Sequence, residues 1–119
     1  MTDPTQGALV FRAGSQPVDT SEDAADSLAA DYLDKLRRSV LELFERRGPI
    51  GATADEVAVY FRCDHNHTSP RVTELAGIKL IERTRVRRKT RKGRGAGVYE
   101  ITSHGLRALA AWRAQERAR

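Results

Sequence analysis

Apolar side chains recur every three or four residues from position 28 onward, which is the spacing of one face of an α-helix. The residues on this face are Leu28, Tyr32, Leu36, Val40 and Leu43. Gly48 and Pro49 follow, and both residue types favour the end of a helix. The pattern therefore predicts one helix of about twenty residues over 27–47.

Two shorter helices are predicted next. Thr53 and Glu56 have the spacing of a capping box, so we expect a helix over 54–61. A polar turn separates it from a third helix over about 66–76, on which Val72 and Leu75 face the core.

The period then changes from that of a helix to that of a strand. β-Branched residues alternate with Arg over 82–90, and a second strand-like segment spans 98–102. The glycine-rich segment 91–97 joins them, which predicts a β-hairpin. A last helix is expected from position 103. Its apolar stripe contains Leu106, Leu109 and Trp112.

The expected architecture is mainly α with a small β-hairpin: a three-helix core, the hairpin and a C-terminal helix, in one domain over 26–119. Residues 1–25 are rich in Pro, Gly, Ser, Thr and Asp, and this composition predicts a flexible acidic arm. The chain has 119 residues, which is the size of one small domain.

Charge is distributed unevenly along the chain. The total is 21 Lys and Arg against 16 Asp and Glu, or +5. Residues 1–31 hold one basic and six acidic residues (1 − 6 = −5), and 32–70 hold six of each. Residues 71–119 hold fourteen basic and four acidic residues (14 − 4 = +10). The basic part is expected to attract a polyanion, and nucleic acid is the leading candidate.

Other function classes find little support in the residues. The single Cys excludes an internal disulfide, and no apolar stretch has the length of a membrane helix, so we expect a cytoplasmic protein associated with the nucleoid. Asp64, His67 and Ser69 lie too close in sequence to form an oriented catalytic triad. Cys63, His65, His67 and His104 do not have the spacing of a closed metal site. We therefore expect neither an enzyme nor a bound metal or cofactor.

The element order resembles that of winged helix-turn-helix proteins. The segments that carry the resemblance are 53–57, 68–75, 78–82 and 98–106. They are similar to MarR-like and PadR-like regulators and to small phage-encoded winged-helix proteins, over about residues 30–115. The resemblance implies that the third helix enters the major groove of DNA, and that the hairpin, the wing of such proteins, contacts the backbone or minor groove.

Candidate DNA contacts are hydrogen-bonding residues expected to be exposed on the third helix, and cations of the wing, 83–97. On the helix they are Asn66, His67, Thr68, Ser69, Arg71 and Thr73. On the wing they are Arg85, Arg87, Arg88, Lys89, Arg91, Lys92 and Arg94. An Arg fork fits guanine and Asn fits adenine. Arg71 has an alternative partner in Glu74, three residues on, and Lys and Arg on a hairpin can instead protect an edge strand.

These observations favour sequence-specific binding of double-stranded DNA by a small transcriptional regulator. Leu28, Tyr32, Leu109 and Trp112 on the first and last helices are candidates for a homodimer interface. The alternative is an adaptor, possibly phage-encoded, that uses the same fold to bind and modulate another protein. RNA is disfavoured because no aromatic side chain interrupts the basic run. The acidic arm could also fold back on the wing.

Overall fold

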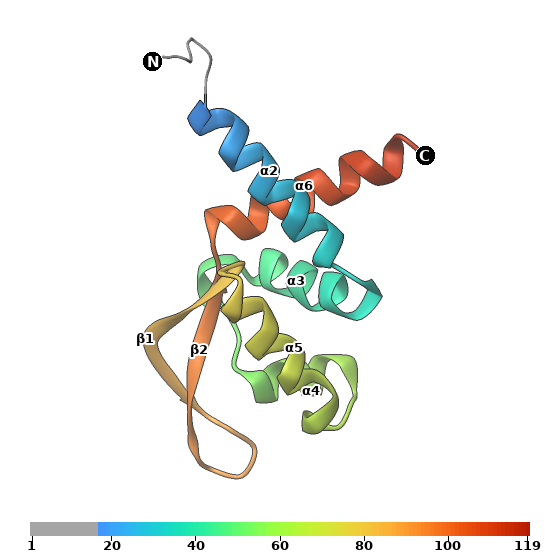
Figure 1. Cartoon of the computed structure of the whole chain (residues 1–119). Coiled ribbons are helices and arrows are strands. Elements are labelled where there is room, and N and C mark those ends of the chain that lie inside the picture. Colours follow the sequence, from blue (N-terminus) through green and yellow to red (C-terminus); the bar gives the residue numbers. More distant parts are fainter. Residues whose placement is uncertain (1–16) are drawn as a thin grey trace.

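The computed structural model describes residues 17–119, with side chains from Ala24 onward (Figure 1). Its elements are α2 (Pro17–Tyr32), α3 (Lys35–Arg47), the 3-10 turn η1 (Gly48–Ile50), α4 (Ala54–Phe61), α5 (His65–Gly77), β1 (Ile81–Lys89), β2 (Gly95–Ile101) and α6 (Ser103–Arg117). This order confirms the expected architecture, mainly α with one hairpin. None of the described helices combines the length and the apolarity needed to cross a membrane.

The prediction of a single helix over 27–47 is wrong. The chain breaks between Tyr32 and Lys35, because the Asp34 side chain accepts a hydrogen bond from the Arg37 amide (2.9 Å) and so starts a new helix as its N-cap. The first helix, α2, begins at Pro17, so the part of the expected arm from residue 17 onward is helical. Residues 1–16 of that arm lie outside the described residues.

The core is built from one face of each helix and the base of the hairpin. Phe44 and Leu41 of α3, Leu75 of α5, Ile81 of β1 and Leu109 of α6 are all buried in it. Leu109 therefore packs inside its own chain, and the prediction that it lies in a dimer interface is wrong. Of the predicted α6 stripe, Leu109 lies in the core and Trp112 packs against it, whereas Leu106 is exposed.

Two more of the predicted interface residues are covered by arginines of α3. The Arg37 guanidinium lies 4.1 Å from the ring centroid of Tyr32, and the Arg38 guanidinium lies 4.3 Å from that of Trp112. Both aromatic rings are half-buried. Leu28 is different, because 71% of its surface is exposed on α2.

The hairpin pairs β1 with β2 in antiparallel register, with Arg83 opposite Tyr99 and Lys89 opposite Gly95. The register shifts between Arg83 and Arg87, so β1 has more residues than β2 in this part. A short bridge between Ala52 and Tyr99 ties the base of the hairpin to the segment before α4. The tip extends away from the crossing of α2 and α6, past the N-terminal end of α5 (Figure 1).

Candidate nucleic-acid interface

Helices α4 and α5 are set by two side-chain caps. The Thr53 hydroxyl accepts from the Glu56 amide and the Glu56 carboxylate accepts from the Thr53 amide, both at 3.0 Å, which confirms the predicted capping box. Arg62 ends α4 in the left-handed conformation (φ 55°). Asp64 then caps α5 by accepting from the Asn66 amide at 2.9 Å. The turn between the helices is thus only three residues long, 62–64.

The outer face of α5 follows from its buried face. Thr68, Val72 and Leu75 are buried against the rest of the domain. Opposite them, Asn66, Pro70 and Thr73 recur at the helical period and are exposed. The first turn and this outer face are therefore the most accessible parts of α5, and Arg71 lies between this face and the core with 28% of its side chain exposed.

The predicted contacts on α5 are sorted by this geometry. Asn66, His67 and Thr73 are exposed, whereas Ser69 and Arg71 are half-buried. Thr68 is fully buried, so the expectation that it is exposed is wrong. It lies four residues before Val72 and so falls on the core side of the helix.

Pro70 is an exposed residue that the sequence analysis did not predict, although it lies four residues after Asn66 and therefore on the same face of α5.

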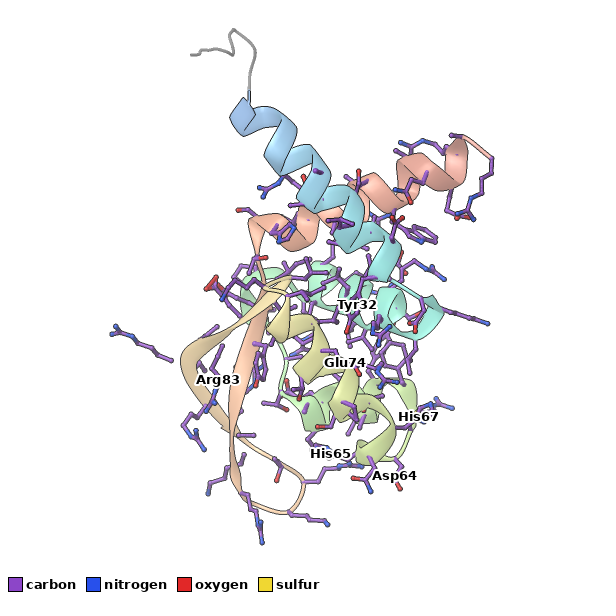
Figure 2. All side chains as sticks on the ribbon, in the orientation of Figure 1. Tyr32, Asp64, His65, His67, Glu74 and Arg83 are labelled. Carbon is purple, nitrogen blue, oxygen red and sulfur yellow. The ribbon has the colours of Figure 1, made fainter. Side chains whose placement is uncertain are left out.

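Figure 2 shows Asp64, His65 and His67 together at the N-terminal end of α5.

Arg71 forms an ion pair with Glu74, the alternative partner that the sequence offered. Its Nε donates to Glu74 Oε1 at 2.7 Å and its Nη2 donates to Glu74 Oε2 at 3.0 Å. Arg37 of α3 also donates through Nε to Glu74 Oε1, at 3.0 Å. The hydrogen bonds from Arg71, and next those from Arg37, lower the pKa of Glu74 below its ordinary value, so this carboxylate is ionised at neutral pH.

Two wing arginines pair with acidic residues of α4 and hold the wing to it; Arg88 is half-buried, whereas Arg91 stays exposed. Arg88 donates through Nε and Nη2 to the Glu56 carboxylate (2.9 and 2.8 Å), and its Nη2 also lies 3.1 Å from the carbonyl oxygen of Ile50. Arg91 donates through Nε and Nη2 to Asp55 (3.0 and 2.7 Å), and its amide donates to the same carboxylate. The Arg88 contact is bidentate, and Asp55 accepts from the side chain of Arg91 through Oδ1 and from its amide through Oδ2; together they fix the tip of the wing relative to α4.

The other wing cations point outward. They are Arg83, Arg85, Arg87, Lys89, Lys92 and Arg94, all exposed. Among residues 24–119 none of the six forms an ion pair, and Arg87 donates to the carbonyl oxygen of Gly95. Gly97 leaves room for one of them, because a Cβ at that position would collide with the Arg83 guanidinium.

An open cleft of about 690 Å³ separates the start of α5 from the tip of the wing. Its lining residues are Cys63, Asp64, His65, Asn66, Thr90, Arg91, Lys92, Arg94 and Gly95. Lys92 and Arg94 supply its unpaired positive charge, and Asn66 supplies amide hydrogen-bonding groups. Within the described residues, no group of three His, Cys, Asp or Glu side chains could hold a metal ion. With Lys92 and Arg94 set against the carboxylate of Asp64, the lining carries an excess of positive charge, which suits a polar, anionic partner.

The anchors of the wing are expected to titrate below the ordinary range of carboxylates. Hydrogen bonds from Arg91 lower the pKa of Asp55. Burial raises the pKa of Glu56, but the hydrogen bonds from Arg88 and Thr53 outweigh burial and leave that pKa lowered as well. A lowered carboxylate pKa stabilises the folded state above the unfolded pKa, and this contribution is lost as the pH falls through the folded pKa.

An NMR titration of the Arg91 amide tests this anchor, because that amide donates to Asp55. We expect its midpoint below the ordinary Asp value of about 3.9. The variant Asp55→Asn should abolish the transition. A midpoint at or above the ordinary value would show that Arg91 does not hold the carboxylate in solution.

The structure is similar to several solved structures. A complex of MepR from S. aureus with DNA matches with a TM-score of 0.61 and 16% identity, over 85% of this chain and 77% of that chain. RV1404 from Mycobacterium tuberculosis matches with a TM-score of 0.54 and 18% identity, over 88% and 79%. SP03579, a MarR family transcription regulator, matches with a TM-score of 0.53 and 26% identity, over 86% and 65%. No family profile and no curated protein sequence matches the chain.

Proposed function

Because the chain has the winged helix-turn-helix fold of MarR-like regulators, we propose that it binds double-stranded DNA and acts as a small transcriptional regulator. The observation that carries the proposal is the cleft between α5 and the wing tip. The cleft is lined on one side by the exposed start of α5 and on the other by Lys92 and Arg94, which have no acidic partner among the described residues. The MepR structure was solved as a complex with DNA, which supports the same role here.

In the proposed complex α5 lies in the major groove, with its first turns at the base edges. Asn66 and Thr73 lie on the outer face of the helix and are its central readers, while His67 and Ser69 flank them. Arg85, Arg87, Lys89, Lys92 and Arg94 contact phosphates or the minor groove. Arg88 holds the wing in place through Glu56, and Arg91, which is paired with Asp55 but 60% exposed, lines the cleft beside Lys92 and Arg94.

We also propose that the protein works as a homodimer in the cytoplasm, bound to the nucleoid. Leu28 of α2 and Leu106 of α6 are exposed by 71% and 47%, and the far ends of both helices project from the rest of the fold (Figure 1). A second copy packed on these helices would cover both leucines and present two α5 helices with two-fold symmetry. The solution mass tests this arrangement.

The salt dependence of binding to random-sequence duplex DNA tests the proposed function. The protein should retain duplex at about 50 mM salt, because the wing is strongly cationic. If the five wing cations proposed to contact DNA each neutralise one phosphate, affinity should fall with salt at a log–log slope of about −4.5. Failure to bind at about 50 mM salt would contradict the proposal and favour the protein-binding adaptor.

A further inference from the structure

Arg37 is held at the junction of α2 and α3 by contacts on several sides. Its guanidinium lies over the Tyr32 ring, and its Nη1 lies 3.4 Å from the Tyr32 carbonyl oxygen and 3.2 Å from Asp34 Oδ2. Its Nε–H points to Glu74. An arginine with this many partners has little rotamer freedom, so it offers a fixed donor to the carboxylate on α5.

Glu74, which Arg37 holds in place, in turn restricts the orientation of Arg71. Its Oε1 accepts from both arginines, and its Oε2 accepts from Arg71 alone. Figure 2 shows Glu74 on the part of α5 nearest to Tyr32, away from the wing. The carboxylate is therefore fixed from the scaffold side, by α3, and in turn fixes a guanidinium on the helix that we propose enters the groove.

The contact with Glu74 uses only one edge of the Arg71 guanidinium. Nε and Nη2 donate to the carboxylate, which leaves the edge formed by Nη1 and the second N–H of Nη2. Two N–H groups on that edge match the O6 and N7 acceptors of guanine. Within the described residues no acceptor contacts Nη1, and the Arg71 side chain is 28% exposed.

We propose that Glu74 determines base preference: it holds Arg71 in the orientation in which its remaining edge reads a guanine. This inference rests on the proposed function. Glu74 is a positioning residue, since it touches no DNA itself. A carboxylate would otherwise be unfavourable beside a phosphate backbone, and here its charge is balanced by two arginines.

The experiment uses the full chain and a pool of duplexes with a randomised centre. Wild type, Arg71→Lys, Glu74→Gln and Arg37→Lys are each taken through selection. The affinities for the selected duplex and for its single-base variants are then measured. Glu116→Gln serves as the matched control, because it removes the same charge from an i, i+3 pair with Arg119 at the far end of α6. Thermal unfolding of each variant checks that it is folded.

We expect wild type to prefer guanine at one position and Arg71→Lys to lose that preference by about tenfold, because lysine cannot fork onto O6 and N7. Glu74→Gln should lose preference at the same position, with affinity for random duplex unchanged or higher. Arg37→Lys should act in the same direction but more weakly. In the Arg71→Lys background, Glu74→Gln should have no further effect, and Glu116→Gln should leave the preference intact.

Each other outcome overturns the inference. If Glu74→Gln changes the affinity for every duplex by the same factor, Glu74 contributes charge or stability rather than specificity. If neither Arg71→Lys nor Glu74→Gln alters the selected sequence, Arg71 does not read a base. If wild type retains no duplex at all, the proposed function fails, and this inference fails with it.

Discussion

Replacing Lys92 and Arg94 together by Gln should weaken binding to random-sequence duplex by roughly tenfold to a hundredfold at about 0.1 M salt. Both residues line the cleft beside the start of α5, and neither forms an ion pair among the described residues. If each contacts one phosphate, the log–log salt slope should become less steep by about 1.8. Fluorescence anisotropy over a salt series measures both quantities.

The matched control for this prediction removes two positive charges elsewhere. Arg117 and Arg119 are exposed at the end of α6, far from the wing tip (Figure 1). Arg117→Gln with Arg119→Gln lowers the net charge by the same amount, and we expect it to leave the salt slope close to that of wild type. Equal effects of the two double variants would mean that affinity for DNA depends on net charge alone, and the proposal that the cleft binds DNA would be contradicted.

Local signals in the sequence predicted the central elements well. The capping box at Thr53 and the apolar residues Val72 and Leu75 placed α4 and α5 within a few residues of their observed bounds. These signals act over three or four residues, so they can be read without the fold. The apolar period runs through the break before α3, so the period alone predicts one helix, and the break is marked only by the short-range cap at Asp34.

The sequence does not predict which arginines of the wing pair with acidic residues of α4. Arg88 and Arg91 look like their neighbours in the sequence, and their partners Glu56 and Asp55 are 32 and 36 residues away. Only the packing of the hairpin against α4 brings these groups together. The register shift between Arg83 and Arg87 cannot be predicted from the sequence of β1 either, because it depends on how β1 pairs with β2.

The structure also changes the interpretation of the acidic residues near the start of the chain. The sequence suggested an acidic arm that could reach the wing, yet five of the six acidic residues before position 32 lie in α2. This helix crosses α6 at the end of the molecule opposite to the wing tip (Figure 1). Asp26, one of the five, is nearly buried and pairs with Arg107 at 3.1 Å. Part of the acidic charge therefore docks α2 on α6.

Gly51→Ala is expected to lower the free energy of unfolding by about 3 kcal/mol or more. Gly51 has φ 64° and ψ −165°, a conformation in which glycine alone is unstrained. A Cβ at this position would also collide with the carbonyl oxygen of Tyr99 on β2. The two causes add, because the backbone cannot relax toward negative φ without moving the bridge between Ala52 and Tyr99.

The same substitution should also loosen the wing, since the Gly51 carbonyl oxygen accepts from Arg47 and from Arg88. Gly77→Ala is the matched control: a Cβ there meets no atom within 4 Å and φ is not positive, so stability should change by less than about 1 kcal/mol. Urea unfolding of both variants measures the difference. A Gly51→Ala protein as stable as Gly77→Ala would mean that the segment before α4 does not pack against β2 as described, and the wing would then lack its attachment at the base.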